Sequence, residues 1–232
     1  MDNSTENNGK SSNVAGIAIT TALVGLLIGF GAAKAMNSNT SDTKTASTTT
    51  APSTATKAAD LRVLLNSLER EHVDLASQAT RNGFDGSADF KASAGALDNN
   101  SVAISKAIGS VYGPAAEAKF LEIWRSHIGF FVNYTVAAKG GDQAGMAKAV
   151  TDLNGYNDAI SDFFSQANPN LPREAVHQLI GDHIGLLKGA VDAYGAKDFA
   201  GSYAKEHDAN VQIGTIADTI AGAIVKQSPS KF

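Results

Sequence analysis

The amino-acid sequence predicts an all-α protein: a six-helix bundle built from three helical-hairpin repeats of about 55 residues, preceded by one transmembrane helix and a disordered linker. Three observations predict it: a long uncharged apolar stretch near the N-terminus, a Ser/Thr-rich stretch after it, and a motif that recurs three times within apolar stripes of helical spacing. The expected parts are a short tail at 1–13, a transmembrane signal-anchor at 14–35, a linker at 36–58 and a helical domain at 59–232 with repeats 59–113, 114–170 and 171–227.

Composition narrows the function classes that suit this 232-residue chain. A formal net charge of −4 and a sequence pI near 5.7 provide no basic surface of the kind that binds nucleic acid, so no nucleic-acid partner is expected. The chain has no cysteine, which excludes disulfides, thiolate metal sites and a cysteine nucleophile. The part after the linker, about 170 residues, is long enough for a self-stabilising domain.

Residues 14–33 form an uninterrupted run of apolar, glycine and threonine residues, and no charged residue occurs between Lys10 and Lys34. A bilayer core about 30 Å thick needs about 20 helical residues, so this run is long enough to span a membrane. Its length favours an uncleaved anchor over a secretory signal, although Ala33-Lys34-Ala35 resembles a cleavage site.

The expected membrane segment contains two glycines at GxxxG spacing, Gly25 and Gly29. This spacing lets two spanning helices approach closely, so it indicates possible self-association of the anchor. The alternative is that the glycines have no such role, because glycine is common in transmembrane helices.

The stretch from Asn37 to Lys57 is rich in serine, threonine and alanine and offers almost nothing to bury. Such composition is typical of a flexible spacer. A threonine-rich stalk after a spanning segment favours a single-pass protein of the cell membrane whose C-terminal domain lies outside the cytoplasm.

A histidine motif recurs at nearly constant spacing after the linker. The pattern H-[VI]-x-[LF] begins at His72, His127 and His183, which are 55 and 56 residues apart. A second motif, D-x-N, follows each histidine and ends at Asn100, Asn154 and Asn210, 28, 27 and 27 residues later. Two motifs at a constant offset indicate an internal repeat.

Each repeat is expected to begin with a helix whose apolar positions recur every three or four residues and include the histidine. These positions are Leu61, Leu64, Leu65, Leu68, His72, Leu75 and Ala76; then Phe120, Ile123, Trp124, His127, Phe130, Phe131 and Tyr134; then Val176, Leu179, Ile180, His183, Leu186, Leu187, Ala190 and Tyr194. Glycine-bearing turns at 82–88, 139–142 and 195–197 end these helices.

A second helix is expected after each turn. Asp89, Asp142 and Asp198 suit its first position, because a carboxylate accepts hydrogen bonds from the free N–H groups there. The apolar stripes of the second helices include Leu97, Asn100, Ile104, Ile108 and Val111; then Val150, Asn154, Asn157, Ile160 and Phe164; then Tyr203, His207, Asn210, Ile213, Ala217, Ile220 and Ile224. Prolines at 114, 169 and 172 separate the repeats.

The histidine and the asparagine of one hairpin lie at similar distances from its turn, which places them at the same height in an antiparallel pair. We therefore expect each histidine to face the asparagine of its own hairpin. One interpretation is a set of buried His–Asn hydrogen bonds that fixes the register of the helices.

The other interpretation is a metal site. If the three hairpins close around a common axis, His72, His127 and His183 lie at one level, with His207 as a possible fourth ligand. Copper or zinc suits imidazole ligands, and Asn100, Asn154 and Asn210 would then hold the rings in orientation. A linear array of hairpins would separate the histidines.

No catalytic motif stands out, and we expect no enzymatic activity. The serines have no neighbouring His–Asp arrangement in the pattern, and there is no phosphate-binding loop. The aromatic residues around Trp124 are expected in the core, where they could also line an apolar pocket.

From Leu61 onward the sequence resembles a family of small, uncharacterised bacterial proteins that are exported or membrane-associated and all-helical. The likeness rests on the histidine that ends an L-x-x-L-x-x-x-H stretch, on the middle segment ANPNLP at 167–172, and on the C-terminal segments IADTI at 216–220, IVKQ at 224–227 and KF at 231–232. The resemblance implies a bacterial origin and a helical fold, without an established activity.

The leading expectation is therefore a membrane-tethered, extracytoplasmic helical domain that binds a protein or small ligand, or acts as a scaffold, without catalysis. The alternative is a histidine-based protein that binds, stores or senses copper or zinc.

Overall fold

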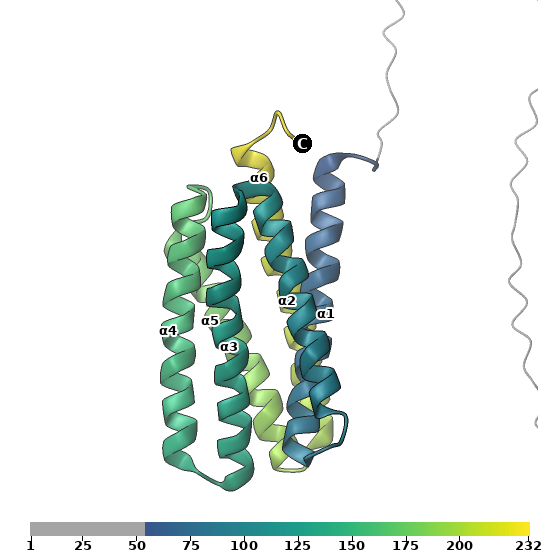
Figure 1. Cartoon of the computed structure of the whole chain (residues 1–232), viewed down its shortest axis with the longest axis vertical. Helices are drawn as coiled ribbons and strands as arrows, with labels where there is room; N and C mark the ends of the chain where they lie inside the picture. The colour runs from purple at the N-terminus through teal and green to yellow at the C-terminus, as the bar shows by residue number, and fades with distance from the viewer. Residues whose placement is uncertain (1–53) are drawn as a thin grey trace, which may run out of the picture. The chain divides into compact units, whose positions relative to one another are not determined.

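The computed structural model describes residues 54–232, which contain six α-helices and no strand, as the all-α prediction requires (Figure 1). The helices are α1 (Lys57–Asp85), α2 (Phe90–Tyr112), α3 (Pro114–Gly140), α4 (Gln143–Ala167), α5 (Arg173–Gly195) and α6 (Phe199–Gln227). The predicted membrane segment with Gly25 and Gly29, and the linker as far as residue 53, lie outside the described residues. None of the helices between residues 54 and 232 combines the length and the apolar character that a membrane crossing requires.

Local sequence sets most helix ends. The side chains of Asp142 and Asp198 accept hydrogen bonds from the backbone N–H of the residue three positions on, at 3.0 and 2.9 Å, as predicted. Asp89 also stands at the first position of its helix, as predicted, but its side chain makes no capping hydrogen bond, because the carboxylate accepts a hydrogen bond from the hydroxyl of Ser87 instead. Between α2 and α3 the only connecting residue is Gly113, whose φ of 90° suits glycine.

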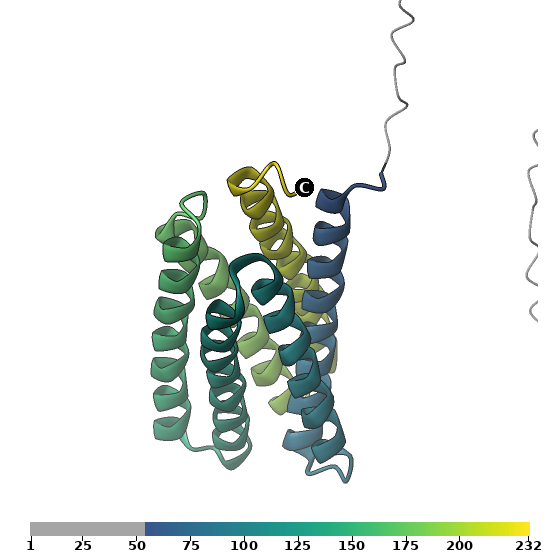
Figure 2. The ribbon, with the colours of Figure 1, turned by 45° about the horizontal axis from the view of Figure 1, so that its top comes forward.

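Consecutive helices pack against each other, and α1 also packs against α6, so the three hairpins close into a ring (Figures 1 and 2). The first helices of the hairpins, α1, α3 and α5, contact one another inside this ring. The start of α1 and the end of α6 lie at the same end of the bundle (Figure 1). The arrangement is therefore closed around an axis rather than linear.

Polar contacts along α1 hold the closing seam with α6. Arg62 pairs with Asp218, and Arg70 donates to the backbone and side-chain oxygens of Asn210 at 2.7 and 2.9 Å. Nearer the hairpin turns, Arg81 pairs with Glu206 at 2.6 Å. Exposed pairs stabilise little individually, but together they fix which residues of the two helices meet.

The D-x-N motif contributes to contacts between neighbouring hairpins. Asp98 of α2 pairs with Arg125 of α3 at 2.6 Å, and Asn210 of α6 binds Arg70 of α1. Both arginines stand two residues before a buried histidine. The corresponding residue of α5 is Gly181, and the α4–α5 seam uses Arg173 with Asp158 and Asp162 instead.

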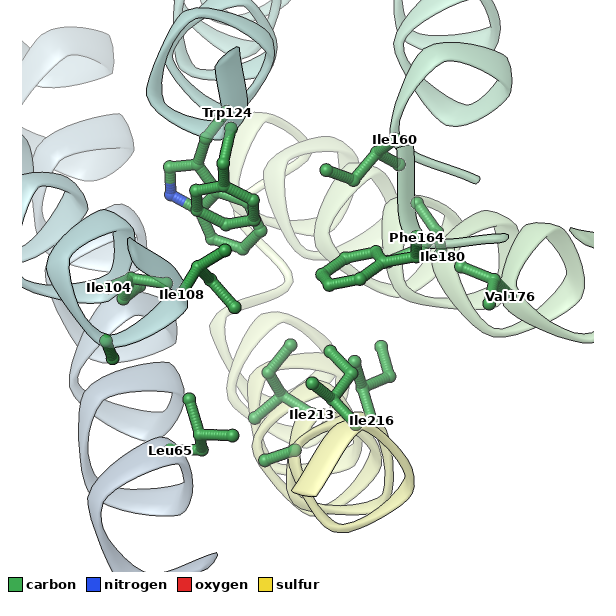
Figure 3. Close-up of a cluster of buried hydrophobic side chains, with 14 of the residues drawn as sticks. Leu65, Ile104, Ile108, Trp124, Ile160, Phe164, Val176, Ile180, Ile213 and Ile216 are labelled. Atoms are coloured by element: carbon green, nitrogen blue, oxygen red, sulfur yellow. The ribbon is translucent and has the colours of Figure 1, made fainter. Parts of the chain in front are cut away.

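The core divides into two unequal halves. We call the end with the chain connections at 113 and 168–172 the connection half, and the end with the hairpin turns at 86–89, 141–142 and 196–198 the turn half. The connection half is filled by large side chains that point into the common interior (Figure 3), among them Leu65, Ile108, Phe164 and Ile213. Phe120 is buried in the same cluster. In the turn half, a smaller separate cluster forms around Tyr134, Ala149 and Val191.

One predicted stripe is displaced. Tyr203, expected on the apolar face of α6, is 61% exposed, and Ser202 is buried in its place. At 100° per residue Ser202 lies within about 20° of Ile213 around the helix, whereas Tyr203 lies about 80° away. The large apolar side chain therefore faces solvent.

Candidate functional site

The three repeat histidines lie on the inner helices, His72 on α1, His127 on α3 and His183 on α5, and all three are buried. The Nε2 atoms of His72 and His127 are 3.3 Å apart, a hydrogen-bond distance when one ring carries the proton. Trp124 packs on both rings, with centroid distances of 4.9 and 4.8 Å. The closed ring of hairpins thus brings His72 and His127 into direct contact.

His183 has a different partner from the one expected. Its Nδ1 lies 2.8 Å from Oε1 of Gln212 on α6, and the Gln212 amide donates to the backbone oxygen of Leu179 at 2.7 Å. The second bond makes Oε1 the acceptor, so His183 carries its proton on Nδ1 and keeps a lone pair on Nε2. That Nε2 is buried and has no hydrogen-bond partner.

The expectation that each histidine binds the asparagine of its own hairpin is wrong for the second and third hairpins. Asn154 is exposed on α4, and Asn210 binds Asp74 and Arg70 at the α1–α6 seam. Asn100 is buried, but it donates to the backbone oxygen of Leu68 and to Glu71. Equal distance from a turn sets the height of a residue and leaves its direction around the helix open.

His207, the possible fourth ligand, is exposed on α6 and takes no part in the buried cluster. The cluster formed by the three buried histidines instead includes a carboxyl group that was not predicted, that of Glu69. Glu69 lies one helical turn before His72, is only 3% exposed, and its Oε2 has no hydrogen-bond partner. The E-x2-H spacing of Glu69 and His72, which places both on one face of α1, was the sequence signal for it.

Burial keeps this cluster uncharged at neutral pH. It lowers the pKa of His72 to about 3 and that of His183 to about 4, against the opposing effects of Asn100 on His72 and Gln212 on His183. Burial, followed by the charges of His72 and His183, also holds the pKa of His127 well below its usual value. Burial raises the pKa of Glu69 to about 8.

A small central cavity of about 20 Å³ separates these groups. Glu69, His72, His127, His183 and Tyr156 all line it, together with apolar side chains. Such a volume holds about one water-sized particle. Within residues 54–232, no three His, Asp or Glu side chains already stand together as they would around a bound metal ion.

A larger pocket of about 360 Å³ lies on the turn side of His72 and His127. It is lined by α1, α2, α3 and α5, and its wall runs from exposed Ser87 and Val136 inward to the two buried imidazoles. The remaining lining residues include Ala76, Ala79, Thr80, Gly83, Phe90, Leu97, Ile128, Phe131, Val132, Thr135, Leu187 and Val191. Of the aromatic residues around Trp124 that were expected to line an apolar pocket, only Phe131 lines this one.

The pocket exists because the inward face of α1 changes size along its length. On one stripe the residues are Leu61, Leu65, Leu68, His72, Ala76, Ala79 and Gly83. Leucines fill the connection half, and the small residues after His72 leave space in the turn half. The change from leucine to alanine and glycine at constant helical spacing was the sequence signal for the pocket.

Comparison with protein-family models, curated proteins and solved structures finds no match to this chain.

Proposed function

We propose that this chain is a binding protein for a small, uncharged, largely apolar organic molecule, which it holds in the pocket between α1, α2, α3 and α5. The observation that carries the proposal is the pocket itself. Its volume of about 360 Å³ lies within the range of about 300–1,000 Å³ typical of small-molecule sites. Its wall is mostly apolar and begins at exposed residues, so a ligand can enter from solvent.

The pocket wall favours a neutral ligand. It contains no Asp, Glu, Lys or Arg side chain. The hydroxyls of Thr80 and Thr135 donate to backbone oxygens of their own helices, at 2.9 Å to Ala76 and 2.8 Å to Phe131. Because these hydroxyls are already paired as donors, the middle of the wall has little need of polar groups on the ligand.

The inner end of the pocket offers polar recognition. His72 and His127 reach it, and an imidazole ring can both donate and accept a hydrogen bond. A hydroxyl or carbonyl group at one end of an otherwise apolar molecule would pair with an imidazole there. The expected ligand is therefore apolar with one polar end.

The proposal includes the tether and the repeat. Residues 14–35 would anchor the chain in the cell membrane as a single-pass protein, with the helical domain outside the cytoplasm and the three hairpins as copies of one non-enzymatic unit. The composition of residues 14–57 supports this placement. Protease treatment of intact cells tests it: the domain should be cut along with a known surface protein, and protection of the domain alone would contradict it.

Binding is tested with the full chain and N-phenyl-1-naphthylamine, a neutral apolar fluorophore. We expect saturable fluorescence enhancement with one site per chain. Ala76→Leu and Val132→Phe fill the pocket from α1 and α3 and should each abolish the enhancement. Ala118→Leu adds the same side chain at an exposed position of α3 in the connection half and should leave it unchanged.

Two outcomes would contradict the proposal. One is the absence of saturable binding by the wild-type chain. The other is equal binding by the wild-type chain and by both filling variants, measured on proteins with unchanged helical circular dichroism.

A further inference from the structure

The small cavity behind the pocket gathers side chains that share one chemical property. Glu69 from α1 and the imidazoles of His72, His127 and His183 from α1, α3 and α5 all line it. All four can act as electron-pair donors, and no lysine or arginine lines the cavity to balance them. A site rich in nitrogen and oxygen donors and free of cationic side chains has the composition that a metal cation requires.

Two of these donors already have the separation of metal ligands. Their Nε2 atoms, on His72 and His127, are 3.3 Å apart. Zinc–nitrogen bonds of about 2.0–2.1 Å at a tetrahedral angle place two nitrogens about 3.3–3.4 Å apart. An ion can therefore bridge this pair with little movement of the two rings.

The hydrogen bond between His183 and Gln212 leaves the other ring nitrogen of His183 free to bind a metal ion. Gln212 holds the Nδ1–H of His183 at 2.8 Å and is itself held by Leu179 at 2.7 Å. The Nε2 lone pair of His183 is left buried without a partner. Metal-binding histidines in proteins typically have this arrangement, in which the far nitrogen donates to an oxygen that fixes the ring.

Glu69 supplies independent support for a cation in the cavity. A carboxyl group buried to this extent needs a partner, yet its Oε2 has none. It stands three residues before His72, the spacing that directs two metal ligands from one helix in carboxylate–histidine bundle sites. A cation in the cavity would give this carboxylate its missing partner.

We infer that the cavity is a binding site for a divalent first-row transition metal, with His72, His127 and His183 as nitrogen ligands and Glu69 as the oxygen ligand. Three imidazoles and one carboxylate suit tetrahedral zinc. His72 and His127 are already at ligand separation, and His183 and Glu69 close on the ion when it binds. His207 and the three D-x-N asparagines have no part in the site.

The test uses the full chain, freed of metal by chelation and titrated with Co²⁺ and then Zn²⁺. We expect one Co²⁺ per chain, with the strong visible absorption of tetrahedral cobalt, and its displacement by one Zn²⁺. Glu69→Gln and His183→Gln should each weaken Zn²⁺ binding at least about 100-fold, and Gln212→Ala about 10- to 100-fold. His207→Gln, the same change at an exposed position of α6, should have no effect.

The variants separate metal binding from folding. Glu69→Gln keeps the size of the side chain, so its metal-free form should melt no lower than wild type. The inference is overturned if the wild-type chain takes up no stoichiometric metal, or if His183→Gln binds Zn²⁺ as tightly as His207→Gln. Metal binding can fail while the fluorophore still binds the pocket, so the outcomes for the two sites are distinguishable.

Discussion

The connection half and the turn half of the bundle are made from the same six helices and differ in how well they are filled. In the connection half, Phe120 stacks on Trp124 at a centroid distance of 5.1 Å and meets Phe164 at 6.0 Å. In the turn half, α1 presents alanines and glycine toward the interior and leaves a pocket of about 360 Å³. The buried histidines lie at the boundary between the two halves.

This difference in packing indicates that the two halves have different roles. Close packing of apolar side chains is the main source of folding stability, so the connection half stabilises the domain. Unfilled apolar space lowers stability, because the atoms around it lose van der Waals partners. The unfilled pocket lowers the free energy of unfolding, which agrees with the proposed role in ligand binding. The close packing of the connection half offsets this loss.

The largest expected effect comes from emptying the connection half. Phe120→Ala should lower the free energy of unfolding by about 3–5 kcal/mol, the usual cost of removing a fully buried phenylalanine. Phe131→Ala, beside the existing pocket, should cost about 1 kcal/mol less, because part of its surroundings is already empty. Urea denaturation of both variants measures the contrast, and an equal loss would contradict the division into two halves.

The second prediction concerns the boundary between the halves. In the metal-free protein, folded Glu69 keeps its proton up to a pKa of about 8, whereas the unfolded carboxyl releases it near 4.5. The folded state thus holds the extra proton between these values, and stability falls as pH rises through them. The three histidines act in the opposite direction: their folded pKa values are lowered, so their contribution is lost as pH falls below about 6.5.

Together these groups predict a stability maximum near pH 6.5. From there to pH 8 the titration of Glu69 should lower the free energy of unfolding of the metal-free protein by about 1–2 kcal/mol, a loss that the histidines offset in part just above pH 6.5. Glu69→Gln should remove most of this loss, since an amide does not titrate. Chemical denaturation at several pH values in the presence of a chelator gives the comparison, and an unchanged slope in the variant would show that Glu69 is charged in the folded state.

The third prediction concerns a substitution that fills the pocket in the turn half. Ala76→Leu should raise the free energy of unfolding by about 0.5–2 kcal/mol, the usual gain from filling a cavity. The exposed change Ala118→Leu should alter it by less than about 0.5 kcal/mol. A gain in stability together with loss of fluorophore binding would link the empty space to the ligand, whereas destabilisation would mean that the wall of the pocket cannot rearrange.

The smallest effect on the free energy of unfolding is expected where α1 contacts α6 in the turn half. Arg81 pairs with Glu206 at 2.6 Å and lies over the ring of Tyr203 at 4.0 Å. Glu206→Gln should cost about 1 kcal/mol or less, because the pair is partly solvated and the contact with Tyr203 remains. The same measurement at high salt should show a smaller difference between wild type and variant.

The helices follow from the amino-acid sequence more directly than the buried site does. The spacing of residues such as Leu61, Ile108, Phe120 and Ile213 placed the core correctly, because burial on a helix follows its 3.6-residue period. The constant offset between the histidine and D-x-N motifs was real in the sequence, but its interpretation within one hairpin was wrong for Asn154 and Asn210. The D-x-N residues Asp98 and Asn210 instead contact arginines of the adjacent hairpin, and sequence alone does not tell which helices become neighbours.

The buried histidine cluster shows in more detail that sequence alone does not fix which side chains meet. His72, His127 and His183 line one small cavity, as expected for three hairpins closed around a common axis. Gln212 as the partner of His183 depended on the direction of each residue around α6, which a difference of two positions changes by about 200°. Glu69 was missed because a glutamate followed by Arg70 and Glu71 looks like part of a solvated face, although its E-x2-H spacing to His72 marked it.

The closure of the ring through α1 and α6 also fixes where the pocket mouth lies relative to the start of α1. The chain enters the bundle at the start of α1, in the connection half, and the pocket opens beside the far end of that helix. With 29 residues, α1 is about 44 Å long, so entry point and pocket mouth stand nearly the full height of the bundle apart. The pocket mouth therefore lies at the end of the domain opposite residue 54, where the described part of the chain begins, and a ligand reaches it without passing the start of α1.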